Sequence, residues 1–160
     1  MNLRNNIAVI IPAAGRSSRF GGSIPKQFFN IGDETVLEKS VNLFLDISGI
    51  KEVIVAINAD EGLIESQSFY ENHRVKIITG GSSRSESVFN ALAVVDESIK
   101  IVAVHDAARP WVKKSHFEDL LTQLVNDESA QGVFPVISVT DSLRMKKGDE
   151  TIPVERENFL

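Results

Sequence analysis

The sequence predicts an α/β protein whose mostly parallel sheet carries helices on both faces. Short apolar runs that do not alternate with polar residues recur along the chain, which is typical of strands buried on both faces. Amphipathic segments with helical spacing separate these runs, and this succession builds a parallel sheet through right-handed crossovers. Glycine-rich or polar segments follow several of the runs, and in such sheets ligands bind at the carboxyl ends of the strands.

The first half of the sheet is predicted from uninterrupted apolar runs. Residues 7–11 are too short an apolar run for a signal peptide and are typical of a first buried strand. A helix over 35–46 places its apolar side chains on one stripe, with Thr35 or Asp33 as its cap. The next predicted elements are a strand over 53–57, a helix over 60–70 and a strand over 75–78.

The second half continues the same alternation and then changes. The predicted elements are a helix over 83–95, a strand over 101–104, a helix over 115–125 and a fifth strand over 132–139. Beyond residue 140, two short strands over 142–145 and 151–154 flank a charged turn that contains Gly148. This pattern indicates an exposed β-hairpin or arm.

Composition and charge exclude several classes of protein. The 160 residues correspond to one ordinary domain, and a net charge of −5 without a basic run argues against general binding to nucleic acid or membrane surfaces. The absence of cysteine excludes a disulfide scaffold, a thiolate zinc site and a cysteine nucleophile, and it fits a reducing cytoplasm. No apolar run approaches the ~18 residues of a membrane-spanning helix.

The first loop, residues 12–27, combines small residues with positive charge. Small residues let the backbone approach a ligand, and free N–H groups in such a loop bind anions. Arg16, Arg19 and Lys26 add cations, so the loop suits a triphosphate. It contains neither the G-x-x-x-x-G-K-[ST] of a P-loop nor the G-x-G-x-x-G of a dinucleotide site. The alternative is a solvated, flexible loop whose cations are incidental.

The second loop, residues 80–87, follows a predicted strand and opens a helix. Its serine hydroxyls and the amides at the helix N-terminus could take a base, a ribose or a phosphate. The structural alternative is a glycine turn followed by a helix cap, because Ser83 and Glu86 stand at capping-box spacing.

The third loop, residues 105–110, follows another buried strand. Asp106 could hold a sugar hydroxyl or a metal, and Arg109 could pair with a phosphate; the alternative is an Asp–Arg pair that ties down the loop. We expect His105 to be a hydrogen-bonded structural residue and Trp111 to serve packing. The three histidines are scattered and predict no metal site.

Together these segments resemble the 2-C-methyl-D-erythritol 4-phosphate cytidylyltransferases of isoprenoid precursor biosynthesis. The resemblance covers nearly the whole chain in the family's order and spacing. The matching segments are Ile11-Pro12-Ala13-Ala14-Gly15, Arg19 with Pro25-Lys26-Gln27, Gly80-Gly81 with Arg84 and Ser87-Val88, and Val104-His105-Asp106-Ala107-Ala108-Arg109-Pro110.

The resemblance implies a Rossmann-like sheet of the nucleotidyltransferase type with a protruding β-arm, and an enzyme of the cytoplasm. It implies that CTP and 2-C-methyl-D-erythritol 4-phosphate (MEP) are joined with release of pyrophosphate, using Mg²⁺, without nucleic acid or membrane as partners. Arg19 and Lys26 match the catalytic positions. The nucleotide positions are Pro12, Ala13, Ala14, Gly15, Gly81, Ser82, Ser87, Asp106 and Ala107, and the substrate positions are Asp106, Arg109, Thr140 and Arg156.

The resemblance also implies a domain organisation and a partner. We expect a nucleotide-binding domain over 1–139, an arm over 140–156 that pairs two copies into a homodimer, and an end at 157–160. The sequence shows no carboxylate cluster, so Mg²⁺ is expected on the CTP phosphates, with Asp106 as the one protein group that could join it.

Three departures from the family pattern leave alternatives open. Ser17 replaces a usual loop glycine, Ser82 replaces a common acidic residue, and the family continues well beyond Leu160, so the chain is interpreted as incomplete. One alternative function is a cytidylyltransferase for ribitol 5-phosphate or another polyol phosphate. An alternative of another class is a nucleotide-binding module without catalysis.

Overall fold

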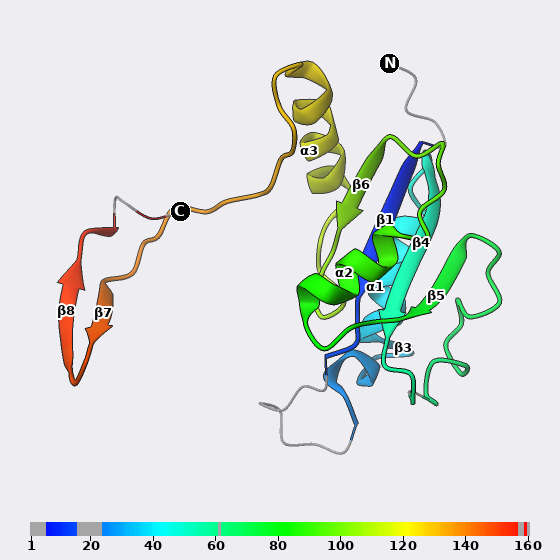
Figure 1. Ribbon diagram of the computed structural model, residues 1–160, viewed down its shortest axis with the longest axis horizontal. Coiled ribbons are helices and arrows are strands. Elements are labelled where there is room, and N and C mark those ends of the chain that lie inside the picture. Colours follow the sequence, from blue (N-terminus) through cyan, green and yellow to red (C-terminus); the bar gives the residue numbers. More distant parts are fainter. Residues whose placement is uncertain (1–5, 16–23, 61, 157–158, 160) are drawn as a thin grey trace. The chain divides into compact units, whose positions relative to one another are not determined.

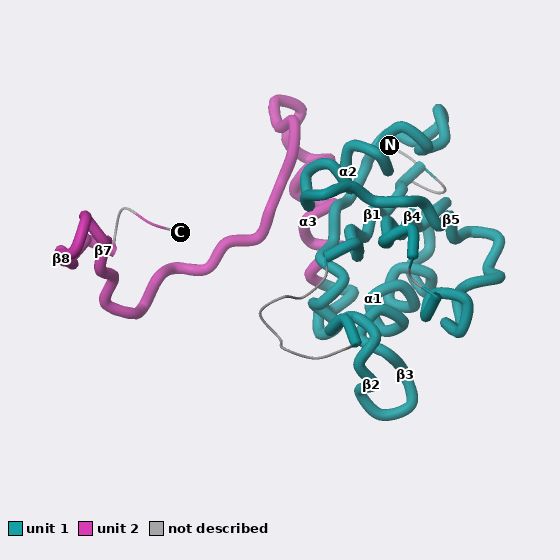
Figure 2. The backbone as a smooth tube through the Cα atoms, turned by 60° about the horizontal axis from the view of Figure 1, so that its bottom comes forward, with its two compact units in different colours: residues 1–115 teal, residues 116–160 magenta. Residues whose placement is uncertain are grey.

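The computed structural model describes residues 6–15, 24–60, 62–156 and 159 of the chain. They divide into two compact units, Met1–Ser115 and His116–Leu160 (Figure 2). In the described part of the chain no helix is long and apolar enough to span a bilayer.

A four-stranded parallel sheet forms the centre of the first unit (Figure 1). Its strands are β1 (Ile7–Pro12), β4 (Ile50–Ile57), β5 (Val75–Thr79) and β6 (Ile101–Val104), in the order β5-β4-β1-β6. Ile10 of β1 pairs in register with Ile54 on one side and Val104 on the other. The chain therefore builds outward from β1 in one direction and then returns to its other side, so the strand order reverses next to β1. The predicted parallel α/β fold is confirmed.

Helices cover the two faces of this sheet, α2 in front and α1 behind in Figure 1. Helix α1 (Val36–Leu45) begins with a capping box, in which Thr35 and Glu38 bond each other's backbone N–H. Helix α2 (Arg84–Leu92) begins after Ser83. Ala91 of α2 packs with Ile10 and Ile54 in a fully buried cluster. Both helices were expected from their periodicity, and both are confirmed.

Short elements between β1 and α1 were not predicted. A 3₁₀ helix, η1 (Lys26–Phe28), follows the first loop. Strands β2 (Asn30–Ile31) and β3 (Glu34–Thr35) then form a small antiparallel hairpin. Two-residue strands give too little periodicity to be detected in a sequence.

The helix predicted over 60–70 is wrong, because the described residues of this stretch form successive turns. Backbone bonds run from Gln67 to Ile64 and from Tyr70 to Gln67, three residues apart. The side chain of Gln67 accepts a hydrogen bond from Thr35 at 2.6 Å, and the amide of Ser68 donates to Glu38 at 2.7 Å. These long-range bonds hold the stretch against the start of α1 and replace the bonds of a helix.

The second unit contains most of α3 (Lys114–Asn126) and a β-hairpin. Strands β7 (Leu143–Lys147) and β8 (Glu150–Val154) pair antiparallel, and Gly148 adopts φ +63° in the turn between them. The predicted helix over 115–125 and the predicted hairpin are confirmed. The fifth strand expected over 132–139 is wrong, because these residues pair with no strand in the described part of the chain, and Phe134, Val136 and Ile137 are exposed.

Candidate active site

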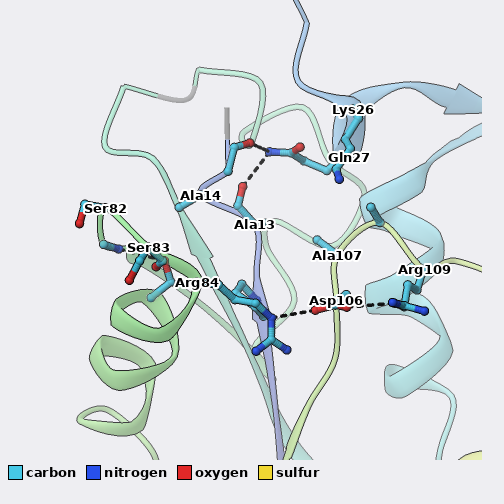
Figure 3. A pocket seen from close by; sticks show the side chains of 15 residues that line it. Ala13, Ala14, Lys26, Gln27, Ser82, Ser83, Arg84, Asp106, Ala107 and Arg109 are labelled. Atoms are coloured by element: carbon cyan, nitrogen blue, oxygen red, sulfur yellow. Dashed lines mark hydrogen bonds and ion pairs between the residues drawn. The ribbon is translucent and has the colours of Figure 1, made fainter. Parts of the chain in front are cut away.

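A cavity of about 660 Å³ opens at the carboxyl ends of the strands (Figure 3). Its size suits a small-molecule ligand, and it lies where the strand order reverses beside β1. The three loops singled out in the sequence all contribute to it. The predicted site residues that line it are Pro12, Ala13, Ala14, Gly15, Lys26, Gly81, Ser82, Ser87, Asp106, Ala107 and Arg109.

The first loop is held in place by a buried amide side chain. Gln27 is only 3% exposed, and its Nε2 donates to the carbonyl oxygens of Ala13 at 2.7 Å and Gly15 at 3.4 Å. The same Ala13 donates its N–H to Ala56 of β4 at 2.7 Å. These bonds fix the backbone that leaves β1, and Lys26 lines the cavity from η1. Arg16 and Arg19 lie outside the described residues.

The second loop is organised by hydroxyls and one carboxylate. The Ser87 hydroxyl donates to the carbonyl of Ser83 at 2.9 Å and accepts from the Gly81 amide at 3.0 Å. One oxygen of Glu86 accepts from the amide of Ser82 at 2.7 Å and from its hydroxyl at 2.6 Å. Ser83 caps α2 as expected. The full capping box is not formed, because the Glu86 side chain bonds Ser82 and not the Ser83 amide.

Two glycines permit close packing in the second loop, and one of them, Gly80, also packs against the first loop. A Cβ on Gly80 would lie 2.7 Å from the Cβ of Ala14 and 2.9 Å from Oγ of Ser87. A Cβ on Gly81 would lie 2.2 Å from Cγ of Glu86. All three distances are far below van der Waals contact, so both positions require glycine for its missing side chain.

The third loop carries a carboxylate between two arginines. The two oxygens of Asp106 accept from Nε of Arg84 and Nε of Arg109, each at 2.9 Å. Partial burial raises the pKa of Asp106, but the hydrogen bonds and charges of the two guanidinium groups outweigh burial and hold that pKa below its ordinary value. Within the described part of the chain, the terminal nitrogens of both arginines make no hydrogen bond. The cluster therefore has a net positive charge and donors available to an anion.

His105 fulfils the expected structural role. Its Nε2 lies 3.1 Å from the carbonyl oxygen of Arg109, which can only accept, so Nε2 carries the proton of this bond. Its ring meets Phe44 edge-on, with centroids 4.9 Å apart. Burial lowers the pKa of His105, so the ring is neutral at neutral pH. Trp111, in contrast, is 73% exposed, and the expectation that it serves packing is wrong.

The two remaining predicted substrate residues lie in the second unit. Nη1 of Arg156 donates to the carbonyl oxygen of Thr140 at 2.7 Å, across the base of the β7–β8 hairpin. The structure brings these two residues together as a pair.

The lining also includes four residues that were not assigned to the site: Gln27, Ser83, Arg84 and Ala108. Gln27 and Arg84 lie in the sequence segments that resemble the family, so those segments could have identified them as site residues. Among the described residues no group of three or more histidine or acidic side chains could hold a metal ion. Asp106, the one acidic lining residue, has both oxygens bonded to arginine.

Comparison with known proteins identifies the family of the chain. The family model for 2-C-methyl-D-erythritol 4-phosphate cytidylyltransferase matches residues 7–158. The chain belongs to this family. The family is one of nucleotidyltransferases, and its activity serves isoprenoid precursor biosynthesis.

Individual relatives cover the chain almost from end to end. The cytidylyltransferase of Haemophilus ducreyi is 35% identical over 99% of the chain, which spans 68% of that protein. The protein of Wigglesworthia glossinidia brevipalpis is 36% identical over 89% of the chain, which spans 61% of it. The crystal structure of the Francisella tularensis enzyme superposes with a TM-score of 0.77 at 31% identity, covering 96% of this chain and 68% of that one.

Proposed function

We propose that this chain binds CTP and MEP and transfers the cytidylyl group from the first to the second. One observation carries the proposal: a single cavity at the strand ends combines small, close-packed loop residues with cationic side chains, in a chain that matches the family over residues 7–158. The phosphate oxygen of MEP attacks the α-phosphorus of CTP. A new P–O bond forms, the bond to the β-phosphate oxygen breaks, and pyrophosphate leaves.

The cavity suits this reaction because phosphoryl transfer depends mainly on positioning and charge stabilisation. Lys26 and Arg19 are proposed to meet the charge that develops on the transferring phosphoryl group. The uncharged part of the cavity, formed by Ala13, Ala14, Gly81 and Ser82, is proposed to take the nucleoside. Asp106 accepts hydrogen bonds from sugar hydroxyls, and Arg109 pairs with anionic oxygen.

Mg²⁺ is proposed to arrive with the nucleotide, as a substrate complex with its phosphates. Mg²⁺ usually keeps waters and substrate oxygens and takes one or two carboxylates from a protein. The described lining offers the single carboxylate of Asp106, which two guanidinium groups already occupy. In the proposed reaction, Mg²⁺ is therefore held by the nucleotide phosphates and not by a dedicated protein site.

The hairpin is proposed to act as the arm of a homodimer and to carry Thr140 and Arg156 toward a neighbouring active site. A lone two-stranded hairpin is marginal in water, and a closed two-fold arrangement would supply its partner. Sedimentation of the chain beside a version ending at Val139 tests this proposal. Identical monomeric behaviour of both at micromolar concentration would contradict it.

Pyrophosphate release with a panel of acceptors tests the proposed reaction. MEP should be used with CTP, and ribitol 5-phosphate should be a poor acceptor. A preference for ribitol 5-phosphate would instead support the polyol-phosphate alternative. Binding of CTP in a calorimeter without turnover of any acceptor would support a nucleotide-binding module. The proposed nucleotide substrate and the lack of cysteine fit a cytoplasmic protein.

A further inference from the structure

Glu86 does not itself line the cavity, but it bonds Ser82, which does. One carboxylate oxygen accepts two hydrogen bonds from that residue, from its amide at 2.7 Å and from its hydroxyl at 2.6 Å. The side chain reaches Ser82 by crossing over Gly81, where a Cβ would collide with Cγ of Glu86. The bonds from the hydroxyl and the amide of Ser82 lower the pKa of Glu86, so the carboxylate is ionised at neutral pH.

The ionised carboxylate fixes the direction of the Ser82 hydroxyl. A serine hydroxyl has one proton and two lone pairs, and it normally rotates to suit either a donor or an acceptor. A carboxylate can only accept, so the proton of Ser82 points toward Glu86. Ser82 lines the cavity, and toward a ligand it therefore presents only lone pairs.

The distribution of charge indicates which part of a nucleotide meets Ser82. Three cationic side chains line the described part of the cavity. Lys26 and Arg109 lie on the side opposite Ser82, and Arg84 turns its guanidinium toward Asp106 of the third loop, where Nε donates at 2.9 Å (Figure 3). Triphosphate oxygens are attracted to the cationic side and repelled by Glu86 on the other. This orientation directs the base toward Ser82.

We propose that Glu86 is a positioning residue for base selection: by holding Ser82 as an acceptor, it favours a pyrimidine with an exocyclic amino group over one with a carbonyl at the same place. The inference rests on the proposed nucleotide site. Cytosine carries a donor at this position and can bond the Ser82 oxygen. Uracil presents an acceptor there, which would leave two lone pairs facing each other. Sites that hydrogen-bond one analogue discriminate in this way because the mismatched groups stay unpaired.

Binding of CTP and UTP to the full chain tests the inference by isothermal titration calorimetry, without a need for turnover. Glu86→Gln keeps the shape of the side chain but removes its charge, so the Ser82 hydroxyl is free to turn its proton toward the cavity. The ratio of CTP to UTP affinity should fall about 3- to 10-fold, as expected for one hydrogen bond. Ser82→Ala should also lower that ratio, because CTP loses its acceptor and UTP no longer meets an opposing lone pair. Ser85→Ala, in the same helical turn but outside the lining, is the matched control and should keep the wild-type ratio.

The outcomes separate this inference from the proposed function. A wild-type chain that binds neither nucleotide overturns both. A wild-type chain that prefers CTP, with the preference unchanged in folded Glu86→Gln and Ser82→Ala, overturns the role of Glu86 alone. Circular dichroism and thermal unfolding establish that each variant is folded, so an unchanged ratio cannot be attributed to a damaged sample.

Discussion

The two ends of the central sheet both carry clusters of charged side chains, but they use them differently. At the amino ends, Glu52 of β4 is 5% exposed, accepts from the Asp96 amide at 2.9 Å and pairs with Lys76 of β5 at 2.6 Å. Lys51 pairs with Asp96 at 2.9 Å. Two acids and two lysines balance in charge there. At the carboxyl ends, one carboxylate serves two arginines, and the cavity is also lined by Lys26.

The two clusters differ in how many hydrogen-bonding groups remain available to a ligand. Both oxygens of Glu52 are bonded within the protein, and Lys76 also donates to the carbonyl of Val94. This cluster ties the segment after α2 to the sheet and leaves little for a ligand. Asp106 instead accepts from one nitrogen of Arg84 and one of Arg109. The other guanidinium nitrogens of these two arginines remain available to a ligand. Ion pairs of similar length therefore use up the hydrogen-bonding groups at one end and leave donors for the proposed ligand at the other.

The test with the largest expected effect removes one lysine from each end of the sheet and compares the two variants. Lys26→Ala should lower kcat for cytidylyl transfer by ~10²–10³, as expected when a charge that stabilises developing phosphoryl charge is lost. Lys76→Ala should leave kcat unchanged and reduce the free energy of unfolding by about 1 kcal/mol, because it leaves Glu52 without its ion pair. Steady-state kinetics and urea unfolding measure both effects. A Lys26→Ala enzyme that lost only affinity for CTP would contradict the transition-state role.

A second test removes the buried acid of the amino-end cluster. Glu52→Ala should cost about 1–3 kcal/mol of unfolding free energy, because the Asp96 amide and Lys76 both lose their acceptor. Glu52→Gln should cost less, since the amide oxygen can still accept from Asp96. CTP affinity should be unchanged in both variants. Equal stability of the alanine variant and the wild type in urea would show that this cluster contributes nothing.

The carboxyl-end cluster should show its stability effect in the pH dependence. The folded-state pKa of Asp106 lies below its ordinary value of 3.8, so its pairs contribute stability above that value and lose it as the pH falls through the lowered pKa. Because the side chain is 38% exposed, Asp106→Asn should cost only about 0.5–1 kcal/mol at pH 7. The difference in melting temperature from wild type should shrink below pH 4. Asp141→Asn, in the second unit, is the control, and a difference that grew with acidity would refute the assignment.

The smallest effect is expected at the exposed pair of the amino-end cluster. Lys51 and Asp96 are 37% and 38% exposed, respectively. Lys51→Ala should change the free energy of unfolding by about 0.5 kcal/mol or less, because exposed ion pairs are weak and screened. Urea denaturation at low and high salt measures this, and a loss above ~1 kcal/mol would show that the cluster acts as one network.

The sequence predicts the four strands of the central sheet because each contains an uninterrupted apolar run, a signal carried by consecutive residues. It fails at 60–70, where Gln67 and Ser68 bond Thr35 and Glu38 of a distant segment. It also fails at 132–139, where the apolar run pairs with no strand among the described residues. For the cavity, small residues and cations in the sequence indicated which loops line it. The hydrogen bonds of Gln27 could not be predicted, because the fold brings it to Ala13, 14 residues away. The bonds of Glu86 are local, but its capping-box spacing indicated Ser83 and not Ser82 as the partner.

Gly80 sets a limit on how this cavity can evolve. Every missense change of a glycine codon adds a Cβ, and at this position the added atom would meet Ala14 and Ser87 at 2.7 and 2.9 Å. No single amino-acid replacement at Gly80 can therefore be accommodated while the first and second loops keep their spacing. A lineage that acquired a different ligand here would have to move backbone at both loops together, or change the residues around the rim and leave this contact intact.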